Sequence, residues 1–505
     1  VAWRDDVGTW RRDLEAKLDA GQDVRMDAEE GARLVEELVK RADRATPETE
    51  SLLAWAQRLR GGIDAQTRAA LSALVALARA HLCRPDAVVF DATSPVWVDR
   101  PLAGCSAWYE LFPRSASPDP ARAGTLADVT DRVPDIAGMG FDVLYLPPIH
   151  PIGHTHRKGA NNRRDAEAGD PGSPWAIGSE SGGHTAIEPA LGTFDDFDRL
   201  VLTARRHGLE VALDLAFQCS PDHPWVREHP DWFRHRADGS IAHAENPPKK
   251  YEDIVPLDFE CEDRAALWAA LLDVVRFWAD RGVRVFRVDN PHTKPFGFWE
   301  WLIAQVRQTD PDVLFLSEAF TRPRVMERLA KVGFAQSYTY FTWRNTKHEL
   351  VEYFTELTQA PLVDFFRPNV WPTTPDILHA ALQHGSRGTF IARAVLAACL
   401  SANYGVYGPA FELMERTPRE EGSEEYLDSE KYQIRHWDVD RPDSLRHFLG
   451  RLNDIRRAHV ALQRNETLRF HHVDNDQLVC WSKQAGNADD AVLCVVNLDP
   501  WSSQA

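Results

Sequence analysis

The stretch GVRVFRVDN, residues 282–290, decides the fold of this chain. Its apolar residues alternate and then follow one another up to Asp289, which is typical of a parallel strand buried on both faces. The stretch VLFLSEAF, residues 313–320, repeats this pattern and delivers Glu318. In a (β/α)8 barrel the C-terminal strand ends form the active-site rim, so the two acids are candidates for a nucleophile and a proton donor. A single acid at a strand end could equally cap the next helix, so the other strand ends must decide.

Strand and helix patterns alternate on both sides of these stretches, which indicates a parallel α/β barrel. The expected strands are 106–113, 143–148, 210–216, 283–290, 313–320, 334–342, 362–371 and one near 405–409. The expected helices are 194–207, 262–281, 296–309, 323–332, 346–359, 387–402 and 444–459. Segment 217–257 lacks helical periodicity and is rich in Pro, His and Trp, so we interpret it as an inserted subdomain. The predicted fold class is α/β, with a (β/α)8 barrel over residues 105–465.

Three further regions are expected around the barrel. Helical patterns at 5–20, 27–44, 48–60 and 65–83 predict a small antiparallel bundle over residues 1–84, whose apolar stripes favour a core or a dimer surface over a cofactor site. Short strands at 87–91 and 96–99 predict the remnant of an N-terminal β domain over 85–104. Strands at 478–482 and 491–497 predict the start of a C-terminal β domain over 466–505. Because the chain ends before that domain could close its sheets, we expect a fragment.

Composition narrows the class of protein. A chain of 505 residues needs more than one ordinary core, and no apolar run approaches the roughly 18 residues of a membrane span. The net charge of −18 argues against a nucleic-acid partner, because it provides no overall basic field for a phosphate backbone. The seven cysteines are scattered singly, without the paired spacing of metal ligands. The start VAWRDD (1–6) is not a secretory signal, which favours the cytoplasm. Together these features predict a cytoplasmic protein with reduced thiols, no cysteine metal site and no membrane span.

Polar residues converge on the barrel rim from four of the expected strands. Asp214 follows the third strand, Arg287 and Asp289 lie on the fourth, Glu318 ends the fifth and Asp376 follows the seventh. Such a set is hard to explain as helix caps alone. Arg287 lies two residues before Asp289 on the same strand face, where it can hold that carboxylate ionised, whereas a general acid at Glu318 must stay protonated. Retaining glycoside chemistry needs this inequality, with the two carboxyl groups roughly 5–5.5 Å apart.

Six motifs carry a family resemblance. They are YLPPIHPIG (145–153), HRKGANN (156–162), QCSPDHPW (218–225), ENPPKKY (245–251), RVDNPHTKP (287–295) and SEEYLDSEKY (423–432). They resemble the signature regions of the α-amylase superfamily, and in detail those of one branch, the bacterial α-1,4-glucan:maltose-1-phosphate maltosyltransferases. The resemblance covers about residues 85–500, and the preceding helical segment is similar to that branch's helical insertion.

The resemblance implies transfer of a maltosyl unit from α-maltose 1-phosphate to the non-reducing end of an α-1,4-glucan, with release of phosphate and a covalent β-maltosyl-enzyme intermediate. By this likeness Asp289 is the nucleophile, Glu318 the acid/base and Asp376 the transition-state stabiliser. The implied donor-sugar residues are Lys158, Gln218 and Arg287, and the implied phosphate residues are Asn246, Lys249, Tyr251 and Asn290. A homodimer formed through the N-terminal regions is expected, with no cofactor.

Two departures from typical amylases bear on activity. Gln218 and Cys219 stand where amylases carry Asn-His, and Pro375 replaces a histidine before Asp376. These changes remove sugar-binding histidines and a usual calcium ligand, so no structural Ca²⁺ is expected and ordinary amylase activity is in doubt. Lys249 beside Lys250 suits a phosphate-bearing donor, although a solvated loop would explain the pair equally well. The histidines at 154, 156, 184, 223 and 292 lack metal-ligand spacing and suit bonds to sugars or backbone.

Two other readings stay open. A glucan hydrolase or trehalose-forming isomerase on the same barrel would act without any dependence on phosphate. A catalytically inactive glucan-binding barrel would have no need of the complete set of Asp289, Glu318 and Asp376, so that set argues against it.

Overall fold

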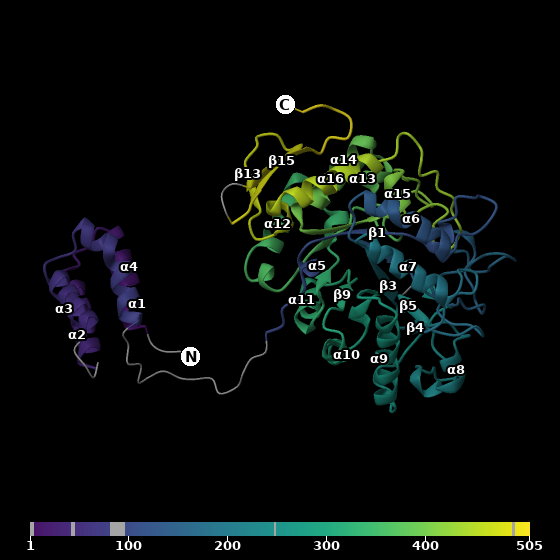
Figure 1. Cartoon of the computed structure of the whole chain (residues 1–505), viewed down its shortest axis with the longest axis horizontal. Coiled ribbons are helices and arrows are strands. Elements are labelled where there is room, and N and C mark those ends of the chain that lie inside the picture. Colours follow the sequence, from purple (N-terminus) through teal and green to yellow (C-terminus); the bar gives the residue numbers. More distant parts are fainter. Residues whose placement is uncertain (1–4, 42–45, 81–95, 247–248, 487–489, 505) are drawn as a thin grey trace. The chain divides into compact units, whose positions relative to one another are not determined.

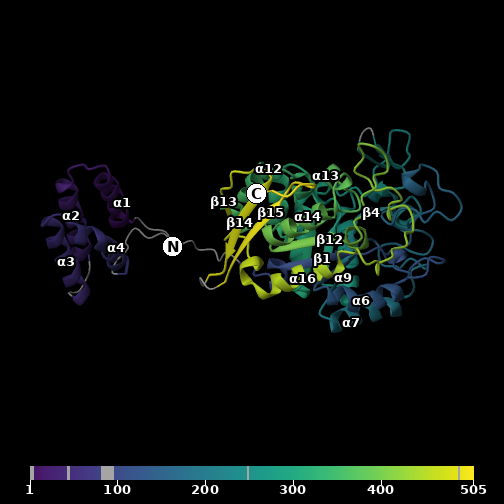
Figure 2. The same cartoon turned by 90° about the horizontal axis from the view of Figure 1, so that it is seen from above.

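The computed structural model describes residues 5–41, 46–80, 96–246, 249–486 and 490–504, with the side chains of Asn246 and Lys249 left out. The chain consists of two units, residues Val1–Val98 and Asp99–Ala505 (Figures 1 and 2). The first unit is helical and the second contains the barrel. Within the described residues, no helix is both long and apolar enough to span a bilayer.

The first unit is a bundle of four helices, α1 (Asp6–Asp19), α2 (Arg25–Lys40), α3 (Pro47–Arg60) and α4 (Ala65–Ala80), as predicted. Their apolar stripes bury one shared core, which includes Trp10, Leu14, Val35, Leu59 and Leu71. The indole of Trp10 packs so closely on Gly31 that a Cβ there would lie 2.1 Å from the ring, and its Nε1 donates to the Asp27 carbonyl at 2.7 Å. A glycine is therefore required where α1 crosses α2.

The second unit is built on eight parallel strands, so the predicted fold class is confirmed. Their sheet order is β10-β9-β8-β3-β2-β1-β12-β11, and a bridge between Ser337 and Pro368 joins the two ends. The strands are β1 (Ser106–Glu110), β2 (Val143–Leu146), β3 (Glu210–Leu215), β8 (Val285–Val288), β9 (Leu314–Ser317), β10 (Gln336–Ser337), β11 (Asn369–Val370) and β12 (Asn403–Tyr407). Each overlaps or touches an expected strand.

Helices cover the outside of the barrel (Figure 1). The long ones are α6 (Leu126–Gly138), α7 (Phe194–Arg206), α9 (Arg264–Asp280), α10 (Phe296–Thr309), α11 (Pro323–Val332), α12 (Lys347–Thr358), α14 (Arg387–Leu400) and α16 (Arg446–Ala458). Shorter helical turns are α5 (Pro101–Gly104), α8 (Pro224–Glu228), α13 (Ala380–Gln383), α15 (Gly408–Glu412), η1 (Pro113–Ser115), η2 (Ala160–Asn162), η3 (Pro230–Trp232), η4 (Pro291–Thr293), η5 (Tyr340–Trp343), η6 (Leu362–Asp364) and η7 (Val460–Gln463).

Helix α7 illustrates how the local sequence sets these elements. A capping box between Thr193 and Asp196 starts the helix, because each side chain bonds the other's backbone N–H. Phe197, Leu200 and Ala204 then recur at helical spacing and are buried against the barrel. This amphipathic pattern is what the sequence predicted for 194–207.

A polar network and α5 close the floor of the barrel. The side-chain amide of Gln336 donates to Ser106 Oγ, Asn403 Oδ1 and the Ala103 carbonyl, each at 3.0–3.1 Å. Trp108 fills the interior above them, with its Nε1 bonded to Ser106 Oγ at 2.9 Å. Because the interior is packed, the site must lie at the opposite, C-terminal rim of the strands.

The inserted segment and the C-terminal sheet are small β elements. In the insertion, β4 (Gln218–Cys219) pairs with β7 (Val255–Pro256), and β5 (Ala244–Asn246) pairs with β6 (Lys249–Tyr251). At the C-terminal end, β13 (Arg469–His471), β14 (Leu478–Gln484) and β15 (Ala491–Asn497) form an antiparallel sheet.

Two short strands were predicted in the segment that precedes the barrel. The predicted strand at 96–99 is wrong, because the described residues there make no strand pairing and Val96 and Val98 are more than four-fifths exposed. Alternating apolar residues alone do not make a strand when no partner strand lies beside them. The predicted strand at 87–91 lies outside the described residues. The boundaries expected at 84 and 104 remain predictions.

Candidate active site

A cavity of about 1160 Å³ opens at the C-terminal rim of the barrel, where the sequence placed the site. Its walls combine strand ends, the insertion and the loop after β12. The candidate residues that line it are Lys158, Gln218, Tyr251, Asp289, Asn290, Glu318 and Asp376. The structure thus brings together seven side chains that lie up to 218 residues apart in sequence (376 − 158).

The guanidinium of Arg287 joins the strand-end carboxylates from beneath the cavity. Its Nη1 donates to Asp214 Oδ2 at 2.8 Å and to Asp289 Oδ1 at 3.1 Å. Its Nη2 lies 2.8 Å from Glu318 Oε1. Tyr145 OH donates a second bond to Asp214 Oδ2 at 2.6 Å. The predicted pairing of Arg287 with Asp289 is confirmed, and the contact with Glu318 is one that the sequence did not indicate.

Burial raises the pKa of two of the carboxyl groups that contact Arg287. Burial raises the pKa of Glu318 to about 8, the Asp289 and Asp376 carboxylates act in the same direction, and Arg287 opposes them. Burial likewise raises the pKa of Asp214, against the lowering effect of Arg287. A neutral carboxyl group still accepts from Arg287 through its carbonyl oxygen. Glu318 is therefore suited to carry a proton at neutral pH, as a general acid requires.

A left-handed turn shapes the wall next to Asp289. Asn290 has φ 41° and ψ 54°, a region that asparagine tolerates better than most side chains, and its N–H points at Glu318 Oε2 at 3.3 Å. Lys294 Nζ donates to the carbonyls of Asp289 at 3.4 Å and Asn290 at 3.3 Å. Burial lowers the pKa of Lys294, against the raising effect of Asp289 and Glu318. Lys294 lies within the motif at 287–295, but the sequence alone indicated no role for it.

Asp376 meets a cation that sequence reasoning also missed. Lys431 forms an ion pair and a hydrogen bond with Asp376 Oδ1, and its Nζ lies 5.1 Å from the centre of the Trp175 ring. Burial is the largest single effect and lowers the pKa of Lys431, but Asp376, Tyr432 and Asp289 together outweigh it and the net shift is upward. Lys431 and Tyr432 both line the cavity. Their motif, residues 423–432, was the available signal, but no pattern within it revealed a partner 55 residues away.

Two of the three predicted donor-sugar residues line the same cavity. The Lys158 side chain is buried in its wall, near the carboxyl group of Asp253. Gln218 begins β4 and donates from Nε2 to the Trp175 carbonyl at 3.3 Å. Arg287 is not part of the wall, because its guanidinium contacts the carboxylates from below.

The structure describes the side chains of two of the four predicted phosphate-binding residues. Tyr251 and Asn290 line the cavity. Asn246 and Lys249 are paired with each other across the β5–β6 hairpin, and their side chains are outside the described residues. Their proposed contacts remain predictions. Lys294, Arg234 and Arg236 add positive charge to the wall of the same cavity.

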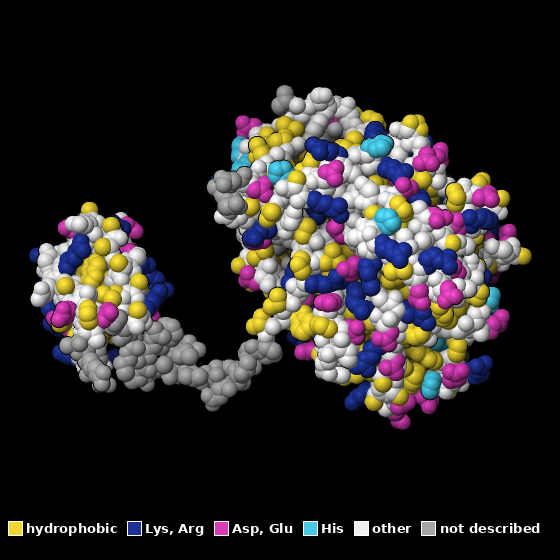
Figure 3. All heavy atoms as spheres, in the orientation of Figure 1, with side chains coloured by type: hydrophobic (Ala, Val, Ile, Leu, Met, Phe, Trp, Pro, Cys, Tyr) yellow, Lys and Arg dark blue, Asp and Glu magenta, His cyan; other side chains and the backbone are white. Residues whose placement is uncertain are grey.

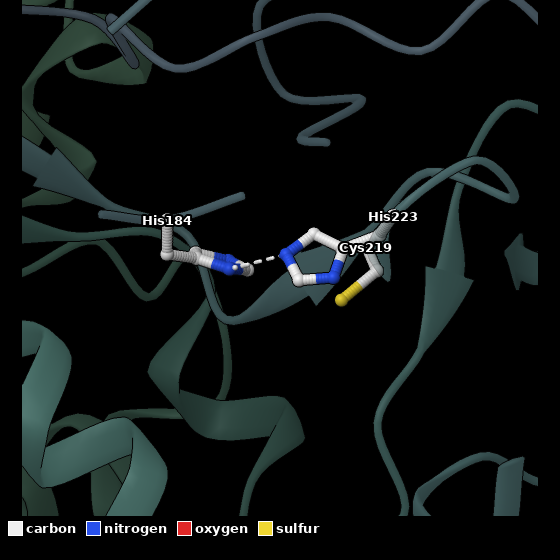
Figure 4. Close-up of side chains that lie close together, drawn as sticks. All are labelled: His184, Cys219 and His223. Atoms are coloured by element: carbon white, nitrogen blue, oxygen red, sulfur yellow. Dashed lines mark hydrogen bonds between the residues drawn. The ribbon is translucent and has the colours of Figure 1, made fainter. Parts of the chain in front are cut away.

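Two histidines and the cysteine that follows Gln218 form a buried group (Figure 4). His184 Nδ1 lies 3.1 Å from His223 Nε2, and the donor atoms of both rings and of Cys219 lie within 4.8 Å of one another. The Trp225 N–H donates to His223 Nδ1 at 3.1 Å, so the proton of that neutral ring is on Nε2. It follows that His184 accepts at Nδ1 and donates from Nε2 to the Ala216 carbonyl at 3.0 Å.

This chain of hydrogen bonds argues against a metal among these three residues. A metal ion would need free lone pairs on the two facing nitrogens, but one carries a proton and the other accepts it. Both rings bond to backbone groups, as expected for His184 and His223. Gly178 and Gly183 pack against the His223 ring so closely that a Cβ at either would come within 2.3 Å of it. The ring therefore has no room to turn.

Protonation of these buried rings is expected to destabilise the fold. Burial lowers the pKa of His223 to about 3, while an unfolded histidine titrates near 6.5. The unfolded state therefore takes up a proton first as pH falls below about 6.5, and stability is lost down to the folded pKa. The contribution of His223 is full above about pH 6.5 and decreases by about 1.4 kcal/mol per pH unit below it.

Urea unfolding of wild type and His223→Gln between pH 7.5 and 4.5 checks this expectation. The glutamine variant should be less stable at pH 7.5 but lose less stability on acidification, because its amide does not titrate. Equal pH slopes for the two proteins would contradict the assignment of His223 as a buried neutral ring.

Three family models match the chain. Residues 1–100 match the model described as alpha-1,4-glucan:maltose-1-phosphate maltosyltransferase, domain N/S. Residues 110–259 match the alpha amylase catalytic domain, and residues 470–505 match the model described as GLGE, C-terminal.

Relatives match over almost the whole chain. A protein of Chlorobaculum tepidum named alpha-1,4-glucan:maltose-1-phosphate maltosyltransferase is 53% identical over 511 residues, which are 99% of this chain and 76% of the relative. A Streptomyces coelicolor protein named alpha-1,4-glucan:maltose-1-phosphate maltosyltransferase 2 is 53% identical over 513 residues, which are 100% of this chain and 75% of the relative.

Solved structures resemble the barrel unit at lower identity. An alpha-amylase from Lactobacillus plantarum superposes with a TM-score of 0.63 at 23% identity, covering 79% of this chain and 90% of the other. An alpha-amylase from Geobacillus thermoleovorans in complex with acarbose gives a TM-score of 0.61 at 16% identity, covering 79% and 88%. At these identities the likeness supports the fold alone.

Proposed function

Because the chain belongs to the family of α-1,4-glucan:maltose-1-phosphate maltosyltransferases, we propose that it moves a maltosyl unit from α-maltose 1-phosphate to the non-reducing end of an α-1,4-glucan by double displacement. The protein is a glycosyltransferase, and phosphate is its leaving group. The observation that supports this mechanism best is that one guanidinium holds Asp289 and Glu318 together while burial favours the protonated form of Glu318.

In the first step Asp289 attacks the anomeric carbon of the donor. The Arg287 guanidinium holds this carboxylate in place at the cavity, so that it can act as a nucleophile. Glu318 donates its proton to the bridging oxygen of the phosphate as the glycosidic bond breaks. Phosphate needs less acid assistance than a sugar leaving group, because its charge is stabilised by cations and N–H donors around it.

In the second step Glu318 acts as a base. It takes the proton of the acceptor's terminal hydroxyl, which attacks the anomeric carbon and releases Asp289. Two inversions give net retention of the α configuration. Asp376 holds sugar hydroxyls in both steps, and Lys431 positions it through their ion pair.

Binding of the donor's phosphate group is what would distinguish this site from that of an amylase. We assign its binding to Tyr251 and Asn290, which line the cavity, and to Asn246 and Lys249 on the β5–β6 hairpin. Lys294 holds the backbone of the Asp289–Asn290 turn at the same wall. A hydrolase or an isomerase would need no such cationic wall.

A phosphate-release assay tests the function. The protein is incubated with α-maltose 1-phosphate, with and without a short malto-oligosaccharide. We expect acceptor-dependent phosphate release and products longer by two glucose units. Maltose and phosphate formed at the same rate without an acceptor would favour the hydrolase reading instead.

Truncation of Lys249 should separate the phosphate site from the sugar site. Lys249→Ala removes a charge-assisted contact of about 1.5–3 kcal/mol, or roughly ten- to hundredfold in kcat/KM for maltose 1-phosphate. Maltosyl fluoride has no phosphate, so its kcat/KM should fall much less. The ratio of the two kcat/KM values is the quantity to measure.

Lys250→Ala is the matched control, since Lys250 is exposed and lies opposite Glu245 in the same hairpin. It should be the milder change for the phosphate donor. If Lys249→Ala lowers both donors equally, or Lys250→Ala is the more severe variant, the phosphate assignment is wrong.

We also propose that the protein acts as a homodimer through its N-terminal regions and works in the cytoplasm. The helical unit carries two large exposed apolar side chains, Met26 and Leu53, which a second copy could cover. Figure 3 shows hydrophobic side chains on the visible face of this unit. The six cysteines of the described residues are unpaired, which suits a reducing compartment. Light scattering after size exclusion, for wild type and Leu53→Glu, tests the dimer.

A further inference from the structure

Two loops of the barrel rim each place side chains in the wall of the cavity. The segment after β2 carries Lys158, and the segment after β12 carries Lys431 and Tyr432. We call them the 158 loop (residues 156–162) and the 431 loop (residues 423–433). Because the loops lie far apart in sequence, contacts in space must decide how their side chains meet one sugar.

Three side chains join the two loops. Asn161 Nδ2 donates to Asp428 Oδ1 at 2.8 Å, and the Asp428 N–H donates to Asn161 Oδ1 at 2.7 Å. Gln433 completes the contact, because its Oε1 accepts from the Asn161 N–H at 2.9 Å and its Nε2 donates to Asp428 Oδ1 at 3.2 Å. These three residues are called the clasp, and three of its four hydrogen bonds cross from one loop to the other.

The clasp holds the backbone of both loops in an uncommon conformation. Asn161 has φ 52° and ψ 38°, and Asp428 has φ 51°. Asparagine and aspartate tolerate this left-handed region better than most residues with a Cβ, but it costs free energy that neighbouring contacts must offset. The hydrogen bonds of the clasp are contacts of that kind, and two of them are made by the N–H groups of these same residues.

Each loop carries a cavity lysine close to the clasp. Asn161 follows Lys158 by three residues (161 − 158), and Asp428 precedes Lys431 by three (431 − 428). Asn161 also lines a small hollow together with Asp376 and Lys431. At so short a separation, loss of the clasp shifts both ammonium groups relative to a bound sugar.

A buried arginine holds the same two segments to the barrel. Arg114 in η1 donates from Nη1 to the Gly172 carbonyl at 2.9 Å and from Nε to the Glu430 carbonyl at 3.1 Å. Its side chain is buried, so these bonds are protected from competition with water. The barrel thus fixes one point of each polar segment, and the clasp joins the segments at a second, half-buried point.

We propose that Asn161, Asp428 and Gln433 are positioning residues that hold the 158 and 431 loops against each other and so set the affinity of the site for the donor's sugar. They act through Lys158 and through the ion pair of Lys431 with Asp376. The inference rests on the proposed function for the identity of the donor, a maltosyl compound. Because the clasp acts on the sugar and not on the leaving group, its loss affects maltose 1-phosphate and maltosyl fluoride equally, in contrast to Lys249→Ala.

Three variants of Asp428 separate the hydrogen bonds from the backbone conformation. Asp428→Asn keeps an acceptor oxygen and tolerates the left-handed region, so KM for both donors should stay within about threefold of wild type. Asp428→Gly removes the acceptor but adopts the conformation without strain, and Asp428→Ala loses both. We expect the glycine and alanine variants to raise KM for both donors by about tenfold, with a smaller change in kcat.

Hydrogen exchange measured by mass spectrometry reports on the loops themselves. In Asp428→Gly the amides of the 158 loop should exchange faster, although the substitution lies 267 residues from Asn161 in sequence. Asp499→Gly is the matched control, because Asp499 also accepts from a glutamine side chain, that of Gln504, and from a backbone N–H, but lies outside the cavity wall. It should leave both KM values and the exchange of the 158 loop unchanged.

The results that contradict the clasp differ from those that contradict the proposed function. The clasp is overturned if Asp428→Gly lowers Tm but keeps the wild-type KM for both donors, if Asp428→Asn is as impaired as Asp428→Gly, or if only maltose 1-phosphate is affected. If the wild type releases no phosphate from maltose 1-phosphate, the proposed function fails. Calorimetric binding of maltotriose then tests the clasp, and equal Kd values for wild type and Asp428→Gly would overturn it.

Discussion

Asp289→Asn is expected to reduce kcat with maltose 1-phosphate by about 10⁴-fold or more, because the amide cannot form the glycosyl-enzyme bond. The fold should survive. Asn has the shape of Asp, and Arg287 keeps its contacts with Asp214 and Glu318, so the change leaves no unpaired buried guanidinium. Phosphate release measures the activity, and thermal unfolding measures the stability.

Asp128→Asn is the matched control for this loss. Asp128 is as buried as Asp289 but lies outside the cavity, where it caps α6 and binds Arg122. These contacts lower the pKa of Asp128 to about 2, so its replacement should cost stability and leave kcat close to wild type. Loss of kcat with retained stability in Asp289→Asn, and loss of stability with retained kcat in Asp128→Asn, would identify a chemical rather than a structural role for Asp289.

Direct labelling gives an independent check on Asp289. A 2-deoxy-2-fluoro maltosyl donor slows the breakdown of a covalent intermediate, so the wild-type protein should carry the label on the peptide that contains Asp289. A label found on Glu318 or Asp376, or near-normal turnover by Asp289→Asn, would remove the nucleophile assignment.

Glu318→Ala is expected to lower steady-state turnover by about 10²–10⁴-fold while leaving the first step with maltosyl fluoride fast. Fluoride leaves without acid assistance, so one equivalent should be released in a burst. The second step still needs a base to deprotonate the acceptor hydroxyl, and the maltosyl-enzyme should therefore accumulate. Rapid-quench measurement of fluoride, together with the intact mass of the protein, follows both steps.

The control for this experiment adds an external nucleophile that needs no base. Azide needs no deprotonation, so it should restore turnover of Glu318→Ala and give a maltosyl azide, whereas it should do nothing for Asp289→Asn. Equal slowing of the burst and of the steady state would mean that Glu318 acts before the intermediate forms, and its role as the base of the second step would be wrong.

Local patterns in the sequence determined much of this protein. The apolar runs that end at Asp289 and Glu318 require buried strands, and the alternation of periods 2 and 3.6 requires a barrel whose strand ends converge. For this reason the candidate acids could be assigned to one rim from the sequence alone. Family motifs supplied the rest of the candidate set, and the cavity contains seven of its members.

Patterns of this kind fail where a residue's role depends on a distant partner. Residues 96–99 alternate like a strand, yet they form no strand pairing in the described structure. Nothing in the local sequence distinguishes Lys431 from other lysines until the fold brings Asp376 beside it.

The tertiary structure also determined which carboxyl group is suited to carry the catalytic proton. The sequence predicted that Arg287 would hold Asp289, but only the packed barrel shows the same guanidinium on Glu318 and Asp214, under a burial that raises the pKa of Glu318. The physical reason is that strand and helix periods follow from neighbours in sequence. Burial and charge pairing are set by neighbours in space, and these appear only when the eight strands close.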